Sequence, residues 1–195
     1  MNKEAKIFDL HNMNFSTANL TEEYIVDTNV LYKLYYSNYP SDDLAGRVYS
    51  KFIEHLLNND VVLRTTSYNI AELLHLIEKA EYECYLDDIG KNKDELSLKE
   101  YREIPEQREK IQNELDLVLL QICSMFEIDD ITTELTILKD FVENYDYIHC
   151  DNYDYSIIQN YKNRNMTNFI SHDADYSYIA NINLYTMNMY ATKAN

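Results

Sequence analysis

Short apolar runs alternate with amphipathic stretches in the first part of the chain. Apolar residues that follow one another over a few positions are typical of buried strands, and apolar residues spaced by a helical turn are typical of helices. The turn and capping residues between them delimit the elements. The expected order is a strand at 24–26, a helix at about 30–35, a helix at about 42–59, a strand at 61–63 and a helix that follows the N-cap residue Ser67 and reaches Ile77.

The second part of the chain opens with a change of character. Gly90, Pro105 and a dense mixture of both charges predict that residues from about 87 to 113 form a solvated loop or an exposed helix inserted into the fold. The expected elements beyond it are a helix at about 115–126, a short strand near 126–131, a helix at about 133–144, a helix at about 151–161 and strands at 168–171 and 182–187. Strands that alternate with helices predict one α/β domain over residues 1–195 with a mostly parallel sheet.

The chain is strongly acidic, because 34 Asp and Glu against 17 Lys and Arg give a formal net charge of −17. This charge repels phosphate backbones on average, so any contact with nucleic acid must be local and metal-assisted. With only 2 Gly, neither a dinucleotide loop nor a P-loop can form. Widely spaced cysteines and the lack of a long apolar run favour a cytoplasmic protein that contacts no membrane. We interpret the 19 Tyr as half-buried core residues rather than as stacking platforms for bases.

Acidic residues stand where the expected elements meet. Because the carboxyl ends of parallel strands share one edge of a sheet, such side chains can gather there. Clustered carboxylates repel one another unless a cation neutralises them, and their hard oxygen atoms favour Mg²⁺ or Mn²⁺. Two such ions can hold an attacking water and a leaving oxygen in line for hydrolysis of a phosphodiester bond. The candidate metal ligands are Asp27, Glu72, Asp154, Asp173 and Asp175.

Four short motifs surround these carboxylates. They are Asp27-Thr28-Asn29-Val30-Leu31, Ser67 with Ala71-Glu72-Leu73-Leu74, Asp154-Tyr155-Ser156-Ile157-Ile158, and Ser171-His172-Asp173-Ala174-Asp175-Tyr176. In this order they resemble the motifs of PIN-domain ribonucleases. The resemblance implies a three-layer α/β/α fold with a mostly parallel five-stranded sheet in the order 3-2-1-4-5. It also implies a carboxylate-bound Mg²⁺ or Mn²⁺, cleavage of RNA and, in many members, the toxin role of a VapC-type toxin–antitoxin pair.

The chain also departs from the pattern it resembles. It is longer than compact VapC-type toxins, it carries the charged insertion at about 87–113, and it is more acidic. These departures weaken the expectation of a toxin more than the expectation of the fold.

Some candidates also have a purely structural interpretation. Asp27 after a strand is a typical turn or N-cap residue. Asp151 is a plausible N-cap, which would place Asp154 at the third helical position, where the helix dipole alone favours a carboxylate. Whether Asp151 replaces Asp154 as a ligand is open at this point. His172 is expected to be a structural or surface residue rather than a general base, because adjacent strand residues point to opposite sides and Asp173 would then face away from it.

Contacts to a substrate are expected from two regions. Asn29 either binds substrate or caps the first helix, and Ser171 either orients a carboxylate or water or closes a turn. Lys91 and Lys93 belong to the charged insertion, which is the local source of positive charge for RNA or a partner protein.

The resulting hypothesis is a metal-dependent endoribonuclease, a hydrolase that acts on RNA. Its expected catalytic residues are Asp27, Glu72, Asp154 and Asp173, with Asp175 as a further metal ligand. The alternative is a non-catalytic acidic PIN-like module that binds a basic partner, such as an antitoxin-like protein. A homodimer is compatible with either hypothesis.

Overall fold

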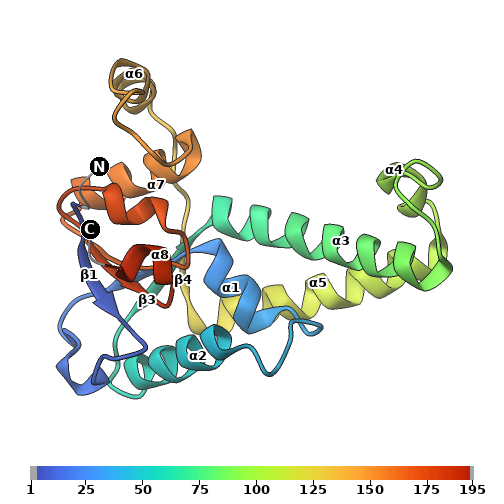
Figure 1. Cartoon of the computed structure of the whole chain (residues 1–195), viewed down its shortest axis with the longest axis horizontal. Coiled ribbons are helices and arrows are strands. Elements are labelled where there is room, and N and C mark those ends of the chain that lie inside the picture. The colour runs from blue at the N-terminus through green and yellow to red at the C-terminus, as the bar shows by residue number, and fades with distance from the viewer. Residues whose placement is uncertain (1–3, 194–195) are drawn as a thin grey trace.

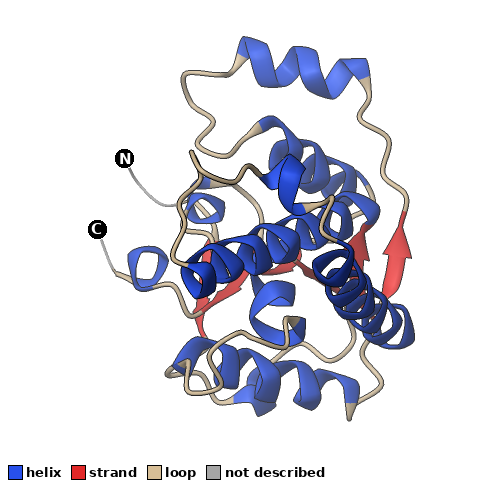
Figure 2. Ribbon diagram, turned by 90° about the vertical axis from the view of Figure 1, so that its right-hand side faces the viewer, coloured by secondary structure: helices blue, strands red, loops and turns tan. Residues whose placement is uncertain are grey.

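The computed structural model describes residues 4–193 of the chain as a single sheet with helices on both sides (Figures 1 and 2). The strands are β1 (Lys6–Asp9), β2 (Tyr24–Val26), β3 (Leu63–Thr66), β4 (Glu127–Asp129), β5 (Asn168–Ile170) and β6 (Asn183–Thr186). The helices are α1 (Thr28–Tyr35), α2 (Leu44–Leu57), α3 (Ser67–Ile89), α4 (Leu98–Tyr101), α5 (Pro105–Met125), α6 (Leu135–Glu143), α7 (Asn152–Asn163) and α8 (Met189–Thr192). Two short 3₁₀ helices span Phe15–Thr17 and Asp175–Tyr178.

The strands form one parallel sheet in the order β1-β6-β5-β2-β3-β4. Without β1, this is the order 3-2-1-4-5 that the sequence resemblance implies. The expectation of five strands is wrong, because β1 adds a sixth at the edge, where Lys6 pairs with Asn183 and Asp9 with Thr186. A four-residue strand with charged residues at both ends has no apolar run by which it could be recognised.

Both faces of the sheet are buried, which confirms the α/β fold class and fits three layers. In β2, Tyr24 and Val26 point into the core formed with α1, α2, α3 and α5, whereas Ile25 points into the core formed with α6, α7 and α8. Tyr185 and Leu184 of β6 divide between the two cores in the same way. The alternation follows from the two-residue period of a strand. Figure 2 shows the sheet between the two layers of helices.

The charged insertion is largely helical. α3 continues to Ile89, where Gly90 closes it with a left-handed backbone (φ 65°), and α5 begins with Pro105 at its first position. α3 and α5 run side by side away from the sheet, and α4 lies at the tip of this hairpin (Figure 1). The hairpin has its own small core, which consists of Tyr82, Leu86, Tyr101 and Ile111. Of the two expected forms, an exposed helix is therefore nearer to the structure than a loop.

One boundary near the site differs from its prediction. β3 covers Leu63–Thr66 rather than 61–63, and Thr66 rather than Ser67 is the N-cap of α3. Thr65 and Thr66 are fully buried although they are polar. The Thr65 hydroxyl donates to the Val26 carbonyl (3.0 Å), and the Thr66 hydroxyl donates to Asn69 Oδ1 (2.6 Å). Because hydrogen bonds satisfy these hydroxyls, polar residues continue a strand that the apolar pattern alone ends too early.

Candidate functional site

Two of the candidate motifs meet where β2 and β5 end. Val26 and Ile170 are partners in the parallel register, and the Asp27 amide donates to the Ile170 carbonyl (3.0 Å). Asp27 and Ser171 are therefore the first residues beyond two neighbouring strands. Asp27 is 6% exposed and is also the N-cap of α1, because its Oδ1 accepts from the Thr28 amide (2.8 Å). The carboxyl ends of β2 and β5 therefore lie next to each other, as expected for neighbouring parallel strands.

A hydrogen-bond network fixes the orientation of the Asp27 carboxylate. Oδ2 accepts from the Ser171 hydroxyl (2.6 Å) and from Asn29 Nδ2 (2.7 Å). The Ser171 hydroxyl in turn accepts from the Asp173 amide (2.9 Å), and Asn29 Oδ1 accepts from the His172 amide (2.7 Å). Ser171 therefore orients a carboxylate and closes a turn at the same time. Asn29 and Ser171, which we expected to contact substrate, position Asp27.

Glu72 lies in the second turn of α3, close to the start of α1. Its Oε2 accepts a hydrogen bond from the Thr28 hydroxyl (2.7 Å), which also lies 3.3 Å from the Asn69 carbonyl. The residue after Asp27 therefore links the end of β2 to the beginning of α3. Glu72 itself is an exposed residue.

Asp151 and Asp154 have different positions at the start of α7. Asp151 is the N-cap, and its Oδ1 accepts from the amides of Tyr153 (2.8 Å) and Asp154 (2.9 Å). Asp154 occupies the third helical position, and its Oδ1 accepts from the Tyr176 hydroxyl (3.0 Å). The capping role is thus filled by Asp151, which leaves Asp154 as the better candidate ligand.

Asp175 lies beyond the end of β5 and contacts Asp173. It begins the 3₁₀ helix after β5, and its amide donates to Asp173 Oδ1 (2.9 Å). Burial and the charge of Asp173 raise the pKa of Asp175, whereas His149 lowers it. Asp175 is therefore connected to the other candidate carboxylates through Asp173.

The electrostatics connect four of the candidates. Burial raises the pKa of Asp27 to about 6; hydrogen bonds from Ser171 and Thr28 lower it, and the charges of Glu72 and Asp173 raise it further. Burial likewise raises the pKa of Asp154 to about 8. The charges of Asp27, Asp151 and Asp173 add to that shift, against a hydrogen bond from Tyr176. None of the ion pairs between described residues includes Asp27, Glu72, Asp154 or Asp173.

A cavity of about 360 Å³ opens between the beginnings of α3 and α7. Its lining consists of Tyr68, Asn69, Glu72, Asp151, Tyr153, Asp154 and Ile157. Among residues 4–193, no three His, Cys, Asp or Glu side chains stand close enough together to hold a metal ion as they are. The donor set nevertheless fits Mg²⁺ or Mn²⁺, because it consists of carboxylate oxygens whose mutual repulsion a divalent cation would relieve. Asp27 and Asp173 do not line this cavity, but their charges raise the pKa of Asp154, which does.

Lys91 and Lys93 are remote from the carboxylates. α3 has 23 residues, so it is roughly 35 Å long. Glu72 lies near its beginning, whereas the two lysines follow its far end. Lys93 also pairs with Glu83 (2.7 Å). The structure therefore does not bring these lysines to the site.

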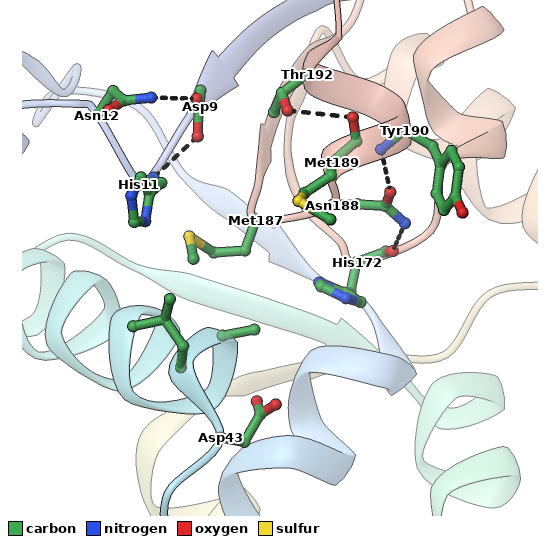
Figure 3. A pocket seen from close by; sticks show the side chains of 12 residues that line it. Asp9, His11, Asn12, Asp43, His172, Met187, Asn188, Met189, Tyr190 and Thr192 are labelled. Atoms are coloured by element: carbon green, nitrogen blue, oxygen red, sulfur yellow. Dashed lines mark hydrogen bonds between the residues drawn. The ribbon is translucent and has the colours of Figure 1, made fainter.

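His172 borders a different and larger cavity of about 560 Å³ (Figure 3). Its Nδ1 lies 3.0 Å from the Tyr49 hydroxyl, and its carbonyl accepts from Asn188 Nδ2 (2.6 Å). Burial, with a contribution from Lys33, lowers the pKa of the imidazole. These contacts agree with the expected structural role. None of the five candidate carboxylates lines this cavity, so its size alone does not mark the site of chemistry.

Three aromatic residues lie at the site although none was predicted to be a site residue, and of these Tyr176 belongs to the fourth motif. Tyr68 and Tyr153 line the carboxylate cavity, and Tyr176 bonds to Asp154. The sequence did contain a signal for the first two, because Tyr68 precedes Glu72 by one helical turn and Tyr153 directly precedes Asp154.

Comparisons with known proteins give little further information. No family model matches the chain, and no curated protein matches it. The crystal structure of PAE2754 from Pyrobaculum aerophilum is similar, with a TM-score of 0.46 and 16% sequence identity over 89% of this chain and 90% of that chain. A likeness of this size indicates no shared function. None of the helices in residues 4–193 combines the length and apolar character that crossing a membrane requires.

Proposed function

We propose that this chain is a PIN-like, metal-dependent endoribonuclease whose site consists of Asp27, Glu72, Asp154 and Asp173. The observation that carries the proposal is the convergence of carboxylates from four separate segments without a cationic side chain among them in the described part of the chain. Burial, with their mutual repulsion in addition, raises the pKa of Asp27 to about 6 and of Asp154 to about 8. A fold gains no stability from such repulsion. Perturbed carboxylates beside a cavity are typical of functional sites, and oxygen-only donors favour a hard divalent cation.

Each side chain has a defined part in this proposal. Ser171, Asn29 and the Thr28 amide hold Asp27 in one orientation. The Thr28 hydroxyl holds Glu72. Asp154 has only one oxygen engaged, by Tyr176, and its other oxygen is available for a ligand. Bound Mg²⁺ or Mn²⁺ would lower the pKa of a water molecule and stabilise the charge that develops on the phosphate.

Cleavage of a mixed-sequence RNA in the presence of Mn²⁺ tests the proposal, with Asp154→Asn as the diagnostic variant. Asparagine can still accept from Tyr176 but is a poor ligand, so activity should fall by at least about 100-fold. Asp27→Asn is less informative, because the Asp27 carboxylate accepts three hydrogen bonds that an amide cannot all retain. Asp116→Asn, with the same charge change at an exposed position on α5, is the matched control and should cleave normally.

The net charge of −17 favours one second candidate, an acidic module that binds a basic partner without catalysis. Under that function the wild-type protein and Asp154→Asn would be equally inactive on RNA. Calorimetric titration with Mn²⁺ would then show no binding that depends on Asp154. Mn²⁺-dependent cleavage that Asp154→Asn abolishes would exclude this candidate.

A further inference from the structure

Two tyrosines expose their rings inside the carboxylate cavity. Tyr68 of α3 is 36% exposed and Tyr153 of α7 is 57% exposed. Their ring centroids lie 5.9 Å apart, with the ring planes inclined by 51°. Both belong to the first turn of a helix, so their backbones are fixed while their rings reach outward. The pair therefore forms an aromatic wall at the mouth of the cavity.

This placement differs from that of the core tyrosines. Tyr24, Tyr49 and Tyr161 are completely buried, and burial of their rings accounts for their presence. Tyr68 and Tyr153 contribute less to the core, because a large part of each ring remains in water. Exposed aromatic rings in a cavity are typical of binding surfaces, since stacking on a ligand recovers the area that the fold leaves uncovered.

The two rings are tied to the carboxylates by helix geometry. Tyr68 and Glu72 are four residues apart in α3 and therefore share one face of the helix. Tyr153 directly precedes Asp154 at the start of α7. A ligand that stacks on the rings thus reaches the same cavity into which Glu72 and Asp154 open.

The charged residues that line the cavity restrict the kind of ligand that can bind there. Its described lining contains three carboxylates but no Lys or Arg. Attraction to a nucleic acid at this place must therefore come from uncharged contacts to the bases, together with any bound cation. Stacking on an aromatic ring supplies such contacts, because every base has a π face, and it requires that the base is not paired.

We propose that Tyr68 and Tyr153 form a nucleobase-stacking subsite that positions the nucleotide next to the phosphate held at the carboxylates. This inference rests on the proposed ribonuclease function, because it assigns the base-binding part of the same site. Purines offer a larger face than pyrimidines, so the subsite prefers a purine. The earlier interpretation of all tyrosines as core residues is therefore replaced at these two positions.

The test is a binding measurement that does not depend on turnover. Fluorescently labelled oligo(A), oligo(U) and an RNA duplex, each of about 12 nucleotides, are titrated with the full chain in EDTA and again in Ca²⁺. Tyr68→Ala and Tyr153→Ala should each weaken oligo(A) binding by roughly 5- to 100-fold, whereas Tyr68→Phe and Tyr153→Phe should stay within about twofold. Oligo(U) should bind less tightly than oligo(A), and the duplex least. Because no basic residue of the described lining contributes, affinity should depend only weakly on salt.

Tyr147→Ala is the matched control, because Tyr147 is 78% exposed and lies outside the cavity lining. Equal loss of binding in this control, unchanged binding in the two alanine variants, or no binding of oligo(A) by the wild-type protein in both buffers would overturn the subsite. Loss of binding in the phenylalanine variants would also do so. If the wild-type protein does not cleave RNA but the alanine variants still lose oligo(A) binding, the subsite stands and the catalytic proposal fails. If the wild-type protein cleaves RNA but the alanine variants bind oligo(A) as tightly as the wild type, the catalytic proposal stands and the subsite fails.

Discussion

Carboxylates at the carboxyl ends of β2 and β5, called here the sheet edge, and in the α3–α5 hairpin have opposite surroundings. In the hairpin, Glu81 is 2% exposed, and its Oε2 lies 2.6 Å from Lys110 Nζ. Burial raises its pKa, but Lys110, with Tyr36 and Asn38 as further donors, lowers the pKa below its ordinary value. At the sheet edge burial also dominates, yet the neighbours of Asp154 are mainly carboxylates, and its pKa rises to about 8.

The difference shows in which of the two regions the chain itself compensates the negative charge of the carboxylates. A buried charge with a cation and two hydrogen bonds is compensated by the fold itself. A group of carboxylates without a cation is compensated only by protons or by an ion from solution. Glu81 is therefore compensated within the fold, whereas the carboxylates at the ends of β2 and β5 fit the ligand-binding role proposed for them, although the residue types are the same.

The largest expected effect is stabilisation by a divalent cation at the sheet edge. An ion that binds the native carboxylates but not the unfolded chain should add about 2.7 kcal/mol to the free energy of unfolding at a hundredfold excess over Kd. Urea denaturation with Mn²⁺ and with EDTA measures this difference. Asp154→Asn should lose most of the increment, whereas Glu81→Gln should keep it. Equal stability with EDTA, Mg²⁺ and Mn²⁺ would remove the distinction between the two regions.

Neutralising one carboxylate in each region should change stability in opposite directions. In EDTA at pH 8, Asp154→Asn should raise the free energy of unfolding by about 1 to 3 kcal/mol, because it removes a repelled charge. Glu81→Gln should lower it by about 1 to 3 kcal/mol, because one of the donors around Glu81 would then face an amide N–H group. The same denaturation assay gives both values. Changes of the same sign in both variants would contradict the comparison.

Most of the fold was predictable because its signals are local. The strands at 24–26 and 168–171 and the helix after the first of them follow from apolar patterns and capping residues. β1 has no such signal, and its position depends on pairing with β6, which is far away in the sequence. Residues 87–113 look like a solvated insertion because they contain Gly90, Pro105 and a dense mixture of charges, and only the structure shows that Lys110 meets Glu81 of α3.

The site was predictable to the extent that carboxylates stand at element boundaries. Asp27, Glu72, Asp154 and Asp173 were chosen as candidates in this way, and the structure connects them through hydrogen bonds or charge. The orientation of a side chain and the distance that a long helix places between two residues depend on the tertiary structure, not on the local sequence. For this reason the distance of Lys91 from the carboxylates could not be predicted, and the spacing of Tyr68 and Tyr153 could indicate only that they lie near Glu72 and Asp154, not that their rings are exposed.

The two regions should also respond differently to pH. In EDTA, folded Asp27 and Asp154 hold protons up to pH values of about 6 and 8, whereas in the unfolded chain they release them near their ordinary value of 3.8. The folded state therefore binds more protons in this window, and stability should fall as pH rises from 5 to 8, by at most about 1.4 kcal/mol per pH unit and proton.

Glu81 acts in the opposite direction and at lower pH. Its lowered pKa gives a stabilising contribution that is present above the unfolded value of 4.5 and is lost as pH falls through the folded pKa. Metal-free protein should thus be most stable near pH 5, and Mn²⁺ should flatten the decline above it. Stability that is constant or rises from pH 5 to 8 in EDTA would show that the sheet-edge carboxylates are not repelled.

The smallest effect is expected for an exposed ion pair of the same hairpin. Arg102 Nε and Nη2 donate to the two carboxylate oxygens of Glu78 at 2.6 and 2.5 Å, and this pairing lowers the pKa of Glu78. The Arg102 side chain is 50% exposed, however, so water replaces much of what the pair contributes. Arg102→Met should cost no more than about 1 kcal/mol. Arg108→Met, at an exposed position of α5, is the control. If Arg102→Met lowers the free energy of unfolding as much as Glu81→Gln does, an ion pair stabilises the hairpin whether or not it is buried. The burial of Glu81 would then not contribute to the difference between the hairpin and the sheet edge.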